Sequence, residues 1–176
     1  MLVGLCAGLS TGASVIISQC YGAHDNARLH DAVHTTIALT FLLCIAATVV
    51  GLAMVPLMLD LMATPADVIE LSREYLNIYF AGITGLLIYN MGSGILRAVG
   101  DAKRPLYFLI VCCLANIVLD LFFVLVLDMG VAGVGIATVL SQVISAVLVI
   151  VTLLRSETAI RLFPKKIAIT GWLLKD

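Results

Sequence analysis

Long uninterrupted apolar runs constrain the fold of this chain more than any other feature of its sequence. In the run from residue 106 to 127, Asp120 is the one charged side chain. Comparable runs cover about residues 1–20, 32–59, 76–96 and 131–154. Each run has at least the roughly 20 residues that a helix needs to cross the hydrocarbon core of a bilayer. The runs therefore predict about five spanning helices.

The composition favours a membrane protein over a soluble one. The chain is 62% hydrophobic and 12% charged, and its mean hydropathy is +1.15. Soluble domains contain roughly 45–50% apolar residues, and those residues are not gathered into runs of this length. We therefore expect an all-α, polytopic transmembrane helix bundle over residues 1–154, surrounded by membrane lipid.

The placement of basic residues predicts the orientation of the bundle. Counted along five spans, only Arg73 falls on one side. The other side holds nine basic residues, which are Arg28, Arg97, Lys103, Arg104, Arg155, Arg161, Lys165, Lys166 and Lys175. The positive-inside rule makes the second side cytoplasmic, so residues 155–176 are expected to form a basic, cytoplasmic, interfacial linker. The chain would then begin at the outer face, which suggests that a first helix is missing and that the sequence is a fragment.

Polar side chains follow one face of each of the last two predicted helices. Asn116 and Asp120 are four residues apart, as are Thr138 and Gln142, so each pair shares a helix face. In a hairpin symmetric about Met129, Asp120 lies level with Thr138 and Asn116 with Gln142. An ionisable group inside a bilayer costs several kcal/mol, roughly, unless it is solvated, paired or occupied by an ion. Structural hydrogen bonding between helices is the alternative interpretation.

Oxygen ligands beside a buried carboxylate suit a hard monovalent cation or a proton. We therefore predict an ion-coupling site at Asp120, Asn116 and Thr138, with Na+ as the candidate metal and Na+ or H+ as the coupling ion. No other cofactor is expected. Gln142, Tyr89 and Asn90 are candidate cavity-lining residues, although packing explains the last two equally well.

Several functional classes are disfavoured by the residues. The sequence offers no combination of nucleophile, base and orienting group, so we expect no enzyme. An intramembrane aspartyl protease would need a second acid within the spans, and only Asp120 is there. No aromatic and basic surface for nucleic acid is present either.

Four segments together resemble one transporter family. They are Gly8–Ser14, Gly94–Asp101, Asn116–Asp120 and Gly133–Thr138. As a set they are similar to the second, fourth, fifth and sixth helices of the multidrug and toxic compound extrusion (MATE) transporters. The resemblance implies twelve helices in two halves, which export organic cations and other amphiphiles by alternating access, driven by entry of Na+ or H+.

The resemblance also implies roles for individual residues. Asn116, Asp120 and Thr138 match the cation site of the family's N-terminal half, and the backbone carbonyl of Val134 joins them. The aspartate that the family carries on its first helix has no counterpart in this sequence. The chain would be most of an N-terminal half, and the missing first helix and C-terminal half would be its partners.

The resulting expectation is a fragment of a cation-coupled multidrug efflux antiporter with drug-like small-molecule substrates, in a bacterial-type inner (plasma) membrane. Two alternatives remain open. One is a lipid-linked precursor flippase of related architecture, which would be expected to place more basic residues in its central cavity. The other is a structural membrane fragment that does not transport.

Overall fold

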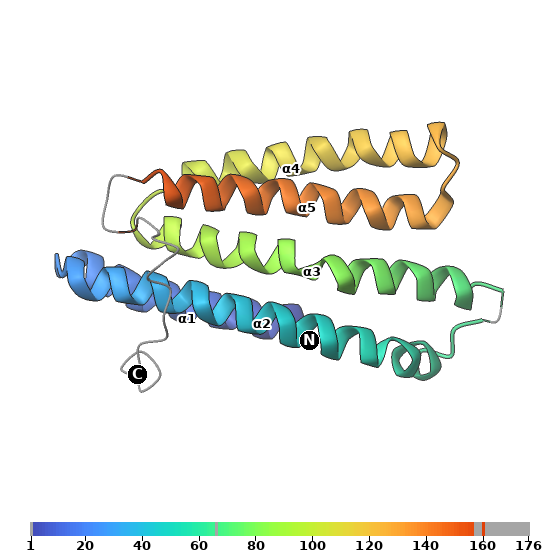
Figure 1. The fold of residues 1–176 in the computed structure, drawn as a ribbon, viewed down its shortest axis with the longest axis horizontal. Coiled ribbons are helices and arrows are strands. Elements are labelled where there is room, and N and C mark those ends of the chain that lie inside the picture. The colour runs from blue at the N-terminus through green and yellow to red at the C-terminus, as the bar shows by residue number, and fades with distance from the viewer. Residues whose placement is uncertain (1, 66, 157–159, 161–176) are drawn as a thin grey trace.

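The chain forms a bundle of long helices that lie side by side (Figure 1). The computed structural model describes residues 2–65, 67–156 and 160. The helices are α1 (Leu2–Gly22), α2 (Asn26–Leu61), α3 (Ile69–Ala98), α4 (Lys103–Leu121) and α5 (Gly130–Leu154), and a π-helical segment η1 (Phe122–Val126) continues α4. The part of the chain that the structure describes contains no strand, which confirms the prediction of an all-α bundle.

Four of the helices are long and apolar enough to cross a membrane. They are α2, α3, α4 together with η1, and α5. The remaining helix, α1, has 21 residues, which is also about the length that crosses a bilayer, and some side chains in its first two turns are not among those described. The bundle therefore has the form of a polytopic membrane protein.

Two helices begin earlier than the apolar runs suggest. Helix α2 begins at Asn26 rather than near residue 32, because the Asp25 carboxylate accepts a hydrogen bond from the backbone N–H of Arg28 at 3.0 Å and caps the helix. Helix α3 begins at Ile69 rather than near residue 76. Hydropathy marks only the stretch suited to lipid, so it misses the polar turns by which a helix extends beyond that stretch.

Alternate helices run in the same direction, and their registers are regular. Ile78 lies against Gly135 and Gly85 against Gln142, a constant difference of 57 residues, so α3 and α5 are parallel. Ser10 lies against Asn90 and Ser14 against Gly94, a constant difference of 80, so α1 is parallel to both. Helices α2 and α4 run the opposite way (Figure 1).

This alternation gathers the basic side chains at one end of the bundle. The basic end carries Arg28, Arg97, Lys103, Arg104 and Arg155. Arg73 lies near the start of α3 at the other end. The predicted linker 155–176 lies outside the described residues except for Arg155, Ser156 and Ile160, and Ile160 packs in the core cluster beside Leu153 at the basic end.

Glycines let α3 approach its neighbours closely. A Cβ on Gly85 would lie 3.1 Å from the backbone carbonyl carbon of Gln142. Glycines at 51, 82 and 92 likewise face side chains of neighbouring helices. By contrast, a Cβ on Gly8 or Gly12 of α1 would meet nothing within 4 Å. Close packing in this bundle therefore centres on α3 and not on the glycine-rich helix α1.

Candidate coupling site and polar cavity

The two polar residues of α4 turn atoms toward the protein. Asp120 and Asn116 are partly buried, whereas Val118 and Leu121 nearby are exposed. The Oδ1 atom of Asp120 and the Nδ2 atom of Asn116 each expose less than 1 Å² and have no hydrogen-bond partner among the described residues. A buried polar atom without a partner costs roughly 1–3 kcal/mol, so such atoms in a folded protein call for an explanation.

The facing helix, α5, carries two of the other predicted residues. The Thr138 hydroxyl donates to the backbone carbonyl of Val134 at 2.9 Å. The Oε1 atom of Gln142 is buried and unpartnered, and its backbone lies against Gly85 of α3. The Thr138 hydroxyl therefore contacts the carbonyl that the family resemblance implies, whereas the unpaired Gln142 oxygen lies farther along α5, where that helix packs against α3.

Two contacts define how α4 lies along α5. A Cβ on Gly133 would lie 3.0 Å from the Cβ of Phe123. The Ser145 hydroxyl donates to the backbone carbonyl of Phe108 at 3.5 Å. In a hairpin symmetric about Met129, residue 125 would lie opposite Gly133 and residue 113 opposite Ser145. In the structure, Phe123 and Phe108 lie at those positions. The symmetric pairing is therefore wrong, by two positions near the turn and by five farther away.

The π-helical segment accounts for part of this displacement. In η1 the backbone N–H of Leu127 donates to the carbonyl of Phe122, five residues earlier, so each turn contains more residues and each residue adds less length. Asp120 is then level with the first turns of α5, near Gly135, and not with the Cα of Thr138. Because side chains tilt toward the N-terminus of their helix, the Thr138 hydroxyl is also displaced toward this level.

These atoms suit a hard cation or a proton better than a transition metal. The described residues contain no group of three or more His, Cys, Asp or Glu side chains that could hold a metal ion. What α4 and α5 offer near the level of Asp120 is its carboxylate oxygen and the hydroxyl–carbonyl pair of Thr138 and Val134, which are the kind of oxygen ligand that hard cations prefer. The unpaired atom of Asn116 is an N–H donor, which cannot ligate a cation, and it makes no hydrogen bond to the Asp120 carboxylate one turn away.

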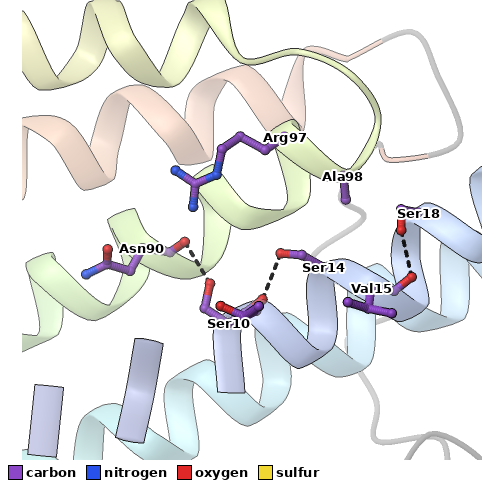
Figure 2. A pocket seen from close by; sticks show the side chains of 8 residues that line it. Ser10, Ser14, Val15, Ser18, Asn90, Arg97 and Ala98 are labelled. Atoms are coloured by element: carbon purple, nitrogen blue, oxygen red, sulfur yellow. Dashed lines mark hydrogen bonds between the residues drawn. The ribbon is translucent and has the colours of Figure 1, made fainter. Parts of the chain in front are cut away.

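A separate polar cavity lies between α1 and α3 (Figure 2). Its volume is about 430 Å³, and its lining consists of Ser10, Thr11, Ser14, Val15, Ser18, Asn90, Arg97 and Ala98. The Ser10 hydroxyl donates to the Asn90 backbone carbonyl at 3.0 Å, which joins the two helices. The side-chain Nδ2 of Asn90 donates to the Leu86 carbonyl at 2.9 Å, so its side-chain oxygen is left as an acceptor.

The two candidate cavity residues of α3 have different surroundings. Asn90 lines the cavity between α1 and α3. Tyr89 packs against the core at the basic end, and its hydroxyl donates to the Pro105 carbonyl at 3.0 Å, so it joins α3 to α4. Sequence reasoning missed the cavity residues of α1 and Arg97. The spacing of Ser10, Ser14 and Ser18 by four residues is the signal that could have revealed this polar face.

The fold and its buried polar atoms define the class of protein. It is an integral membrane helix bundle with a partly buried acid within one spanning helix, a feature typical of transporters. The chain belongs to the MatE family, whose model matches residues 1–122.

Similar proteins of known class support this assignment. The chain is 37% identical over 163 residues to the probable multidrug resistance protein YoeA of Bacillus subtilis (strain 168), covering 89% of this chain and 35% of that protein. It therefore spans about a third of the length of the curated relatives it matches. The relative in Bacillus subtilis is named a probable multidrug resistance protein, and the solved structures are described as MATE transporters.

Solved structures share the arrangement of helices. A structure described as the inward-facing conformation of a multidrug resistance MATE family transporter matches with a TM-score of 0.91 at 28% identity, covering 99% of this chain and 40% of that one. A structure described as the outward-facing conformation matches with a TM-score of 0.90 at 28% identity, covering 99% of this chain and 39% of that one. The helices of this chain therefore resemble the corresponding helices equally well in both conformations.

Proposed function

We propose that the chain forms one wall and the coupling-ion site of a cation-driven multidrug exporter. The observation that carries the proposal is the buried, unpartnered Oδ1 atom of Asp120. An ion or proton that comes and goes from this oxygen would explain why it is buried without a protein partner. Na+ and H+ are both compatible with the oxygens present.

Each residue has a distinct part in this proposal. Asp120 provides the charge that attracts the cation, and Asn116 places its side-chain N–H one helical turn away on the same face. The Thr138 hydroxyl shares its proton with the Val134 carbonyl, which leaves the hydroxyl oxygen free to face a cation. Gln142 has a buried amide oxygen about two turns farther along α5 than the level of Asp120.

Coupling follows from the difference between the loaded and the empty site. A bare carboxylate in a low-dielectric bundle favours an arrangement that admits water, whereas a neutralised one tolerates enclosure. Because the helices of this chain match the inward-facing and outward-facing relatives with TM-scores of 0.91 and 0.90, we infer that they move largely as one body. The relatives are about three times as long as this chain. The rest of the transporter, which corresponds to their remaining length, would complete the substrate path.

The same proposal assigns the orientation. The basic end, and with it Arg155, would face the cytoplasm of a bacterial-type cell, because basic loops are retained on that side. Expelled compounds would be drug-like amphiphiles, as the names of the relatives suggest.

Substituting the acid tests the proposal. Asp120→Asn keeps the shape and removes the charge, so it should abolish drug resistance in cells while the amount of protein in the membrane stays the same. Asp128→Asn is the matched control: Asp128 lies in the turn between η1 and α5 with a φ of 52°, a conformation that asparagine also adopts readily. Unchanged resistance for Asp120→Asn at equal expression would refute the ion site.

A further inference from the structure

The side chain of Val139 on α5 straddles Gly82 on α3. A Cβ on Gly82 would overlap both γ carbons of Val139 and would lie 2.8 Å from its Cβ, so the two methyl groups rest against bare backbone. A β-branched side chain in a helix strongly prefers one χ1 rotamer, so these methyl groups do not turn aside readily. The contact therefore resists rotation of α5 about its axis and also fixes the distance of α5 from α3.

Thr138 immediately precedes Val139, and its hydroxyl takes its position from α5 alone. The hydroxyl donates to the Val134 carbonyl at 2.9 Å, within the same helix. Among the described residues, the Thr138 side chain makes no hydrogen bond to another helix. Where this oxygen lies relative to Asp120 on α4 therefore depends on how α5 is rotated and held.

A second contact of the same kind lies farther along the two helices. A Cβ on Gly92 would overlap one γ carbon of Val149 and would lie 3.4 Å from its Cβ. Gly92 is ten residues beyond Gly82, which is roughly 15 Å toward the basic end. The structure thus contains one such contact beside Thr138 and a comparable one away from it.

We propose that the contact between Gly82 and Val139 is a positioning element of the coupling-ion site. It holds the Thr138 hydroxyl and the Val134 carbonyl where they can face the ion. Neither Gly82 nor Val139 has a side-chain group that binds an ion, so both act through Thr138. A methyl group on residue 82 would push α5 away from α3 or turn it, and either movement would displace these oxygens relative to Asp120. The inference rests on the proposed function and adds a determinant of its ion affinity.

Transport of ethidium by the full-length transporter in proteoliposomes, measured against Na+ concentration and against pH, tests the proposal. Gly82→Ala should raise the half-saturating Na+ concentration by about 10-fold, the effect of weakening one contact to a charged group, while the rate at saturating Na+ changes less. If protons drive transport, the pH of half-maximal transport should move by about one unit, which is the same factor in ion concentration. Loss of rate without a change in ion dependence would overturn the proposal.

Val139 supplies the rescue and the conservative control. In the double variant that combines Gly82→Ala with Val139→Ala, the γ carbons that the new methyl group overlaps are gone, so most of the ion affinity should return. Val139→Ile keeps the branch at Cβ, so its ion dependence should match that of the natural protein. A double variant that does not regain ion affinity would refute the positioning role.

Gly92→Ala separates positioning from a general loosening of the bundle. Its methyl group meets Val149 as that of Gly82→Ala meets Val139, so both variants should lower the melting temperature in detergent. The half-saturating Na+ concentration should stay at its natural value in Gly92→Ala, because Thr138 lies far from this contact. Equal shifts in the two variants would show that the ion site responds to any separation of α3 from α5, and the proposal would be wrong.

A third variant decides the matter where Gly82→Ala does not accumulate in the membrane. Val139→Ala removes both methyl groups without adding volume elsewhere, so α5 can turn and the ion affinity should fall. Val139→Ile should keep the natural affinity. Equal ion dependence in these two variants would contradict the proposal.

Cross-linking reports the position of Thr138 without reference to transport. The two contacts between α4 and α5 described above place Asn116 roughly level with Thr138. In a cysteine-free background, Asn116→Cys and Thr138→Cys should form a disulfide on oxidation, more slowly with Gly82→Ala and at an unchanged rate with Gly92→Ala. Absence of the cross-link, or an unchanged rate with Gly82→Ala, would refute the positioning. If Asp120→Asn keeps the natural ion dependence, the proposed ion site is wrong, and the cross-linking rate still shows whether the contact positions Thr138.

Discussion

The hydroxyl of Tyr89 donates to the backbone carbonyl of Pro105 at 3.0 Å, which joins α3 to the first turn of α4 across the tight connection between them. Tyr89→Phe removes this bond and nothing else, so it should lower the free energy of unfolding by about 1 kcal/mol. Thermal denaturation in detergent measures the loss. Resistance to each compound should keep its rank order, and a change in that order would place Tyr89 in the substrate path after all.

Thr138→Val should weaken the dependence of transport on the coupling ion. The change removes the hydroxyl and keeps the side-chain volume, so the Val134 carbonyl loses its side-chain donor and the site loses an oxygen. Transport is measured against Na+ concentration and against pH in proteoliposomes. Thr152→Val serves as the control because Thr152 makes the same bond to the residue four positions earlier, Leu148, at 2.7 Å, farther along α5. A similar effect in both variants would show that the loss of a threonine side-chain hydrogen bond within α5 causes it, and that Thr138 does not bind an ion.

Gln142→Met should separate stability from function. The replacement has nearly the same shape and removes a buried amide oxygen that has no partner, so the protein should become equally or more stable. If the oxygen serves an ion, the half-saturating ion concentration for transport should rise several-fold. Loss of stability without a change in ion dependence would show that Gln142 has a structural partner in the membrane.

Gly85→Ala should destabilise the bundle. The added methyl group would lie 3.1 Å from backbone atoms of Gln142 and Val143, which cannot rotate away, so α3 and α5 must separate slightly. Overpacking of this kind costs roughly 1–3 kcal/mol. Gly12→Ala is the control, because its methyl group would meet nothing within 4 Å. Equal decreases in melting temperature in detergent for both variants would show that the loss comes from helix propensity or expression and not from the contact between α3 and α5.

The sequence alone predicts the bundle well, because each spanning helix must carry an apolar run of sufficient length. It also identifies Asp120, since a charge within such a run stands out. It predicts less well where the helices end, because capping residues such as Asp25 extend a helix into polar sequence. The ends of α2 and α3 show this limit.

The pairing of α4 with α5 was beyond sequence reasoning for a physical reason. Counting residues from Met129 assumes the same rise per residue on both sides of the turn, and η1 breaks that assumption. The cavity beside Arg97 was missed because an arginine near the end of an apolar run normally extends toward the headgroups. The structure shows that its guanidinium points back along α3 toward Asn90, in an open groove beside α1.

The π-helical turns at Phe122–Val126 also make chain length adjustable at that point. Deleting one residue there can let the backbone rewind as an ordinary α-helix, so the rest of α4 keeps its orientation. The same deletion one turn earlier would rotate one part of α4 about its axis by about 100° relative to the other part. The Asp120 carboxylate would then face the lipid instead of the protein. Natural variants shortened by one residue should therefore be tolerated in this segment and purged just before it.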